Sequence, residues 1–173
     1  MSPLVKVSVR YGVLAGIVGS FVTIGLYYMG AHPLLIPAYM DFRIVLCAIF
    51  IFFALREIRD YHYEGKLHLW QGLFASFLFA IIYGILASAI LVIFMLVVPA
   101  FLADYIVLAT QLMKSYSPGE IEKMGKEIFN SNLEKLPATN AYDIGWPYFF
   151  GSLRNSLFLS IILSVILRRQ PKT

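Results

Sequence analysis

Three charged residues fall within predicted membrane-spanning segments: Asp41, Arg43 and Arg154. A guanidinium group donates paired hydrogen bonds to a carboxylate or to a phosphate. An ionisable side chain inside a bilayer costs at least about 2–3 kcal/mol unless it is paired, hydrated or able to reach the surface. These residue types therefore offer either an internal ion pair or the binding of an anionic group.

Helix length predicts that these charges share one depth. Arg154 lies 14 residues before Arg168, or about 21 Å of helix, and Asp41 lies 15 residues before Arg56, or about 22 Å. Measured from Leu69 and Arg10, the same length brings Tyr83 and the region of Tyr27 to this level. The sequence thus predicts an intramembrane polar layer, which comprises Asp41, Arg43, Tyr83, Arg154 and Asn155, with Tyr27 nearby.

Two interpretations of this layer stay open. In the first, Asp41 pairs with Arg154 and ties two segments together, while Arg43 reaches outward to lipid phosphates. In the second, Arg43 and Arg154 together hold an anionic headgroup or phosphate, for which their planar donors are suited. The first is structural and the second is functional.

Four apolar segments must position these residues: about 11–31, 37–55, 69–101 and 148–167. The chain is 60% hydrophobic and only 14% charged, whereas soluble domains are about 25% charged. We therefore expect an all-α fold, a polytopic transmembrane four-helix bundle forming a single integral membrane domain over residues 1–173. The segment 11–31 exceeds the apolar core of a signal peptide and predicts a retained anchor.

The third segment is longer than a bilayer requires. Leu69 to Ala103 contains no charged residue, and 35 residues of helix would extend about 52 Å. Pro99 is the expected position of a bend or of the exit from lipid.

The positions of lysine and arginine predict the orientation. Most of them flank the segment ends that share one side, which predicts that both termini are cytoplasmic in a bacterial inner membrane. The loop 104–147 is net acidic and is expected on the outer side. Within it, Ser117, Pro118 and Glu120 form a helix-start pattern that predicts an amphipathic helix over about 118–129.

Small residues recur at intervals of four in three of the segments. This spacing allows two helix backbones to approach closely in lipid. It predicts compact packing within the chain, with a smooth face for another protein as the alternative. The positions are Gly12, Gly16 and Ser20; Gly72, Ser76, Ala80, Gly84 and Ser88; and Ser152, Ser156, Ser160 and Ser164.

No hydrolase, P-loop or zinc-protease motif occurs in the sequence. His62, Glu64 and His68 match no specific metal-binding spacing, and the single cysteine, Cys47, lies in an apolar run. The net charge of +4 is not arranged as a continuous basic face for nucleic acid. We therefore predict no catalytic, cofactor-binding or metal-binding residues and no nucleic-acid partner.

A cluster of charges ends the second segment: Arg56, Glu57, Arg59 and Asp60. Pairs three apart in this cluster have like charge, so they stabilise the helix little. The cluster is either a solvated helix end or a candidate surface for a partner.

Several short motifs follow a familiar order: "RYG" at Arg10 to Gly12 with Gly16 behind it, "IRDY" at Ile58 to Tyr61, Gly65, Gly72, and a long loop before the last segment. The chain in this respect resembles the uncharacterised small membrane proteins of Bacteroidota grouped as domain of unknown function 4199. The resemblance implies a four-span inner-membrane protein without catalytic residues to carry over. Genes of such families often lie beside envelope glycosyltransferase genes, and the resemblance therefore favours a role in the cell envelope.

Together these observations predict a non-enzymatic membrane protein that serves as an accessory or assembly partner in envelope biogenesis. The alternative is a small translocator of lipids or lipid-linked sugars that binds an anionic headgroup at Arg43 and Arg154. The expected partners are membrane lipids and a membrane protein such as an envelope glycosyltransferase, or a second copy of the chain.

Overall fold

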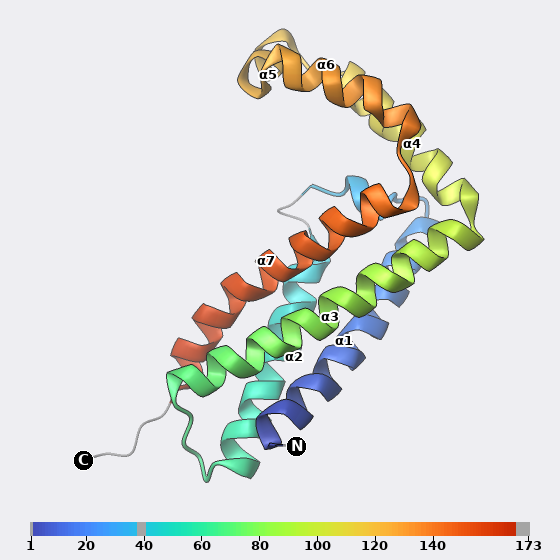
Figure 1. The fold of residues 1–173 in the computed structure, drawn as a ribbon. Coiled ribbons are helices and arrows are strands. Elements are labelled where there is room, and N and C mark those ends of the chain that lie inside the picture. Colours follow the sequence, from blue (N-terminus) through green and yellow to red (C-terminus); the bar gives the residue numbers. More distant parts are fainter. Residues whose placement is uncertain (1, 38–40, 169–173) are drawn as a thin grey trace.

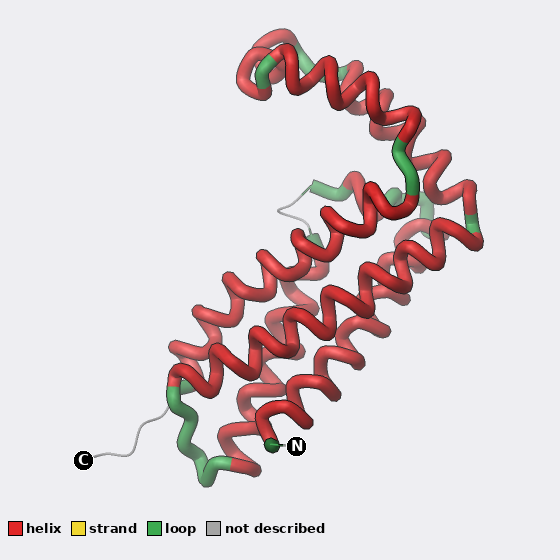
Figure 2. Tube along the Cα trace, viewed as in Figure 1, coloured by secondary structure: helices red, strands yellow, loops and turns green. Residues whose placement is uncertain are grey.

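The computed structural model describes residues 2–37 and 41–168. In this part of the chain the fold is all-helical and forms no β-strand (Figure 2). The helices are α1 (Pro3–Tyr28), η1 (Pro33–Leu35), α2 (Phe42–Glu57), η3 (Ile58–His62), α3 (Leu69–Val97), α4 (Pro99–Lys114), α5 (Pro118–Met124), α6 (Lys126–Lys135), η4 (Leu136–Ala138) and α7 (Ala141–Leu167).

Four of these helices, α1, α2, α3 and α7, pack lengthwise and form the body of the molecule, whereas α4, α5 and α6 form an arm beyond one end of it (Figure 1). Helix α3 packs along α1 on one side and along α7 on the other. The start of α1, the end of α2, the start of α3 and the end of α7 lie at the same end of the body. This end therefore carries Lys6, Arg10, Arg56, Arg59 and Lys66.

Three helices, α1, α3 and α7, are long and apolar enough to cross a membrane. Helix α2 has 16 residues, about 24 Å, and begins at Phe42, later than the predicted start at residue 37. The delay follows from Asp41, whose backbone is extended and whose carboxylate accepts a hydrogen bond from the backbone N–H of Arg43. Asp41 is thus the N-cap of α2 and not a residue within it.

The predicted 69–101 segment divides at Val98. Pro99 cannot donate a backbone hydrogen bond, so α3 ends at Val97 and Pro99 begins α4. The bend expected at Pro99 is confirmed, and it directs α4 into the arm (Figure 1).

Two further helix boundaries differ from the predicted ones, at the start of α7 and within the segment 118–129. Helix α7 begins at Ala141, seven residues before the predicted start, because the Asn140 side chain accepts hydrogen bonds from the N–H groups of Tyr142 and Asp143. The helix predicted over 118–129 is two helices, since Gly125 adopts φ +91° between α5 and α6. At Ser117 the expected start is confirmed, with the Glu120 carboxylate accepting from its backbone N–H at 2.8 Å.

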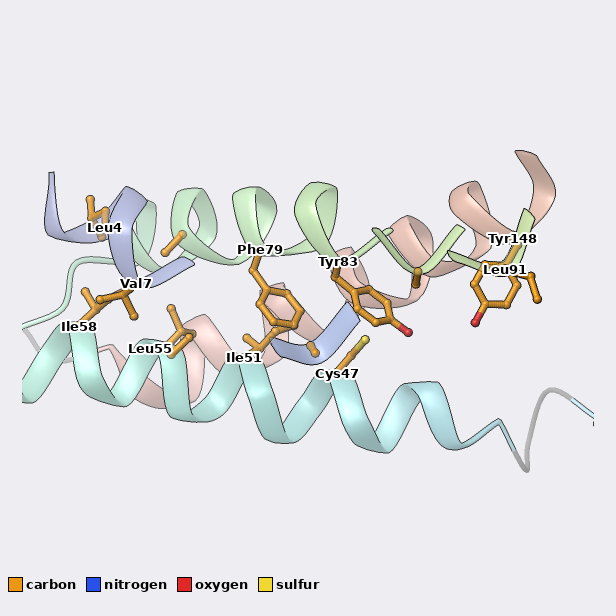
Figure 3. Packing of buried hydrophobic residues seen from close by; sticks show 14 of the residues in the cluster. Leu4, Val7, Cys47, Ile51, Leu55, Ile58, Phe79, Tyr83, Leu91 and Tyr148 are labelled. Carbon is orange, nitrogen blue, oxygen red and sulfur yellow. The ribbon is translucent and has the colours of Figure 1, made fainter. Parts of the chain in front are cut away.

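Small residues bring α3 close to both neighbours. A Cβ atom added at Gly12 of α1 would lie 3.0 Å from Cβ of Ile82, and one added at Gly72 of α3 would lie 2.8 Å from Oγ of Ser164. The four serines of the α7 stripe are all buried, as the close-packing interpretation expects. An apolar cluster forms most of the rest of the core, and Figure 3 shows Ile51 and Leu55 of α2 and Ile58 of η3 among its members.

Replacement of Gly12 by valine is expected to destabilise the protein by about 1–3 kcal/mol, because the new side chain would overlap Ile82 and the carbonyl oxygen of Phe79. The matched control is Gly25→Val on the same helix, where an added Cβ meets nothing within 4 Å. Thermal unfolding in detergent measures both. Equal losses in the two variants would contradict the close approach of α1 and α3.

Candidate functional site

Asp41 and Arg43 form an ion pair within one turn at the start of α2. The Nε atom of Arg43 donates to Oδ1 and Oδ2 of Asp41 at 2.8 and 2.9 Å, and Nη2 donates to Oδ2 at 2.5 Å. The two side chains are 10% and 24% exposed. Asp41 therefore pairs with Arg43 and not with Arg154, because a guanidinium two residues beyond the N-cap is within reach of the capping carboxylate.

Arg43 also connects two helices of the body. Its guanidinium carbon lies 4.6 Å from the ring centroid of Tyr148 on α7. A cation over a tyrosine face is attracted by the ring quadrupole, by about 0.5–2 kcal/mol. The Arg43 guanidinium therefore contacts Asp41 and Tyr148, and few of its N–H donors remain free to bind an external anion.

Arg154 is the charged residue of the predicted layer that remains exposed. It projects from α7 beside a groove of about 350 Å³, which Ile44 of α2 also lines together with Asn155, Phe158 and Leu159. Within the described residues Arg154 has no salt-bridge partner. Its side chain thus lies on the outer surface of the body, with half-buried Asn155 next to it.

Tyr83 of α3 lies in the interior of the body. Its ring is fully buried and stacks on Phe79 at a centroid distance of 6.0 Å. Its hydroxyl is buried and has no hydrogen-bond partner in the described part of the chain. The structure therefore places the members of the predicted polar layer in three separate settings: a closed ion pair, an outward arginine and a buried tyrosine.

The charge cluster at the other end of the body is more ordered than the spacing suggested. Glu57 forms an ion pair with Arg10 of α1 and accepts from the Tyr11 hydroxyl at 3.0 Å. The π-helical turn at 58–62 brings Arg59 onto the adjacent Asp60, at 2.6 Å.

Arg56 adds a contact to Asp60 at 3.5 Å, four residues away. The Arg59 guanidinium lowers the pKa of Asp60, so this carboxylate is charged at neutral pH. The spacing of three did not predict these contacts, which join residues one and four apart. Arg56, Asp60 and the highly exposed Tyr61 still face solvent and remain a candidate partner surface.

Sequence reasoning missed a polar contact between α1 and α4. The Tyr27 hydroxyl donates to Oδ2 of Asp104 at 2.8 Å, and Nε2 of the buried His32 lies 3.1 Å from the carbonyl oxygen of Phe101. Tyr27 was expected near the Asp41–Arg43 level but instead meets the arm. The available signal was Asp104, the first charged residue after the 35-residue uncharged stretch.

Across residues 2–37 and 41–168, no three His, Cys, Asp or Glu side chains are grouped so that they could hold a metal ion. His62 approaches Glu57 at 3.9 Å, whereas Glu64 and His68 join neither of them in such a group. Cys47 is buried, and its sulfur accepts from the Ser156 hydroxyl at 3.5 Å.

Asp41→Asn is expected to destabilise the protein by about 1–3 kcal/mol, because it leaves the Arg43 charge unpaired in a largely buried position. Asn still caps the helix, so the effect isolates the charge. Adding Arg43→Gln should recover part of the loss, with a coupling of about 1 kcal/mol or more. In the matched control, the loss of stability caused by Arg154→Gln should be additive with that caused by Asp41→Asn. The free energy of unfolding of each variant is measured in detergent. A coupling of Asp41 to Arg154 without a coupling to Arg43 would refute the Asp41–Arg43 ion pair.

Comparison with known proteins identifies the family of the chain. A family model described as protein of unknown function (DUF4199) matches residues 10–169. No curated protein and no solved structure matches the chain. The match covers α1 to α7 almost completely and includes the motifs at Arg10 to Gly12 and Ile58 to Tyr61. The chain therefore belongs to the DUF4199 family.

Proposed function

We propose that the protein is a non-enzymatic, four-span inner-membrane protein of the Bacteroidota that serves as an accessory or assembly partner in envelope biogenesis. In this proposal the body lies in the bilayer, with the positively charged end and both termini in the cytoplasm. Helix α2, about 24 Å long, packs along α1 and α7 and would provide the fourth crossing, with Asp41 and Arg43 near the outer edge of the hydrocarbon. The closed Asp41–Arg43 pair lowers the cost of the charges at its outer end.

The arm is the observation that carries the partner role. It extends past the end of the body (Figure 1), which in this proposal lies outside the membrane, and it exposes large apolar side chains, namely Leu112, Met124 and Ile128. Exposed apolar surface outside the lipid favours contact with another protein. The occupant that we propose is the outer segment of another envelope membrane protein, such as a glycosyltransferase.

A photo-crosslinking amino acid at Leu112 or Ile128 is expected to yield one discrete protein adduct in native membranes, because these side chains are exposed on the arm. The matched control is Phe158, which is more exposed than either residue but lies on α7 within the body and should crosslink to lipid. Gel mobility and mass spectrometry of the adduct identify the partner. Adducts at Phe158 but none at the arm would contradict the proposal, and an adduct of twice the chain mass would replace it by self-association.

The alternative is a translocator of lipids or lipid-linked sugars. It is favoured by Arg154, an exposed guanidinium beside an apolar groove. Arg43 contributes little to it, because its donors are directed at Asp41. The space enclosed by Ser20, Thr23, Ala87, Leu91 and Tyr148 is too small for a water molecule, so a headgroup would move along the α2–α7 surface and not through the body.

Arg154→Gln is expected to reduce retention of phosphatidylglycerol by about threefold to tenfold, because it removes a charge-assisted contact to the phosphate. Native mass spectrometry of the purified protein measures the bound lipid. Arg56→Gln, an exposed arginine at the opposite end of the body, is the matched control and should retain the lipid. Unchanged retention in Arg154→Gln would exclude Arg154 as the headgroup site.

A further inference from the structure

A pocket of about 470 Å³ lies where the end of α1 meets the start of α4. Its polar lining comes from Tyr27, Tyr28, His32 and Asp104, and the exposed side chains of Val107 and Leu108 complete one wall. The pocket is at the arm end of the body, where Tyr142 and Trp146 of α7 are also exposed. Exposed aromatic side chains of this kind are typical of the headgroup region of a bilayer.

The charge in this pocket is negative. Asp104 is exposed, its Oδ2 accepts the Tyr27 hydroxyl, and in the described part of the chain no basic side chain forms an ion pair with it. A carboxylate beside an apolar helix end is stabilised by a counter-charge. The structure therefore presents an acceptor that lacks a cation.

His32 does not supply that cation. Its Nε2 faces the carbonyl oxygen of Phe101, so this nitrogen carries the proton, and its buried Nδ1 has no hydrogen-bond partner. The ring is 8% exposed, and burial lowers its pKa, so His32 is neutral at neutral pH. It packs on Phe101 at 4.6 Å, as does Tyr27 at 4.8 Å, which holds the pocket wall in place.

We propose that this pocket binds the primary ammonium headgroup of a phospholipid of the phosphatidylethanolamine type. A primary ammonium offers three N–H donors, which suit the free lone pairs of the Asp104 carboxylate. The Tyr27 and Tyr28 rings line the same pocket and attract a cation at their faces. Val107 and Leu108, at 55% and 41% exposure, line the same pocket, so an acyl chain beside the headgroup would meet apolar side chains, and this favours a lipid over a soluble amine.

The proposal rests on the membrane location in the proposed function but not on the partner role. Its test uses the full chain purified in detergent and offered equal amounts of phosphatidylethanolamine, phosphatidylcholine and phosphatidylglycerol with identical acyl chains. Native mass spectrometry is expected to show phosphatidylethanolamine retained about fivefold more than phosphatidylcholine, whose nitrogen has no N–H donor. Equal retention of these two lipids would overturn the proposal, whatever the crosslinking of the arm reveals.

Variants identify the site. Asp104→Asn can still accept the Tyr27 hydroxyl, and it should lower phosphatidylethanolamine retention to the level of phosphatidylcholine. Tyr27→Phe keeps the ring and the carboxylate and should retain the preference. Glu134→Gln, an exposed carboxylate on α6, is the matched control and should also retain it. Full preference in Asp104→Asn would refute the site.

The lipid source has its own control. Glycerophosphoethanolamine carries the same headgroup without acyl chains, and at equal concentration it should bind at least about tenfold more weakly, because it lacks the apolar contact with Val107 and Leu108. Binding as strong as that of the phospholipid would refute the proposed lipid source.

Discussion

The close approach of α3 to both α1 and α7 is the constraint on which the rest of this structure depends. Lipid gives apolar helices no hydrophobic reason to associate, so backbone proximity and van der Waals contact must hold them together. Gly12 and Gly16 of α1 meet Ile82 and Leu86 of α3, and Gly72 of α3 meets Ser164 of α7. Larger side chains at these glycines would separate the helices and open the space around them.

Because the interior is so tightly packed, the charged groups lie at its edges. Asp41 and Arg43 neutralise each other at the end of α2, and Arg154 points outward from α7. Asp104 lies at the other junction, where the bend at Val98 brings α4 against the end of α1. The charged groups that could bind a ligand therefore lie on the perimeter of the body. For this reason the translocator alternative concerns the surface of the body, the ammonium pocket lies at the junction of α1 with α4, and the partner surface lies farther along the arm.

Much of the fold was predictable because it depends on local properties. Apolar length located α1, α3 and α7, Pro99 located the bend, and Ser117 located the start of α5. The errors arose where a single residue overrides the pattern. Asp41 and Asn140 act as caps through their side chains, and Gly125 divides a helix through its positive φ. The sequence "NAYD" at Asn140 to Asp143 carried a capping signal that apolar length alone did not reveal.

The sequence by itself determined that the protein is all-helical with long apolar segments, and it contained the family motifs. Helix lengths counted from the segment ends also identified Asp41, Arg43 and Arg154 as charges within apolar segments. Only the tertiary structure decided how these charges are used. Depth along a helix says nothing about the direction in which a side chain leaves it, so a residue at the right level can face a partner, the interior or the lipid. Arg43 folds onto Asp41, Tyr83 turns inward and Arg154 turns outward. The Tyr27–Asp104 contact joins residues 77 apart, and only the packing of α4 against α1 brings them together.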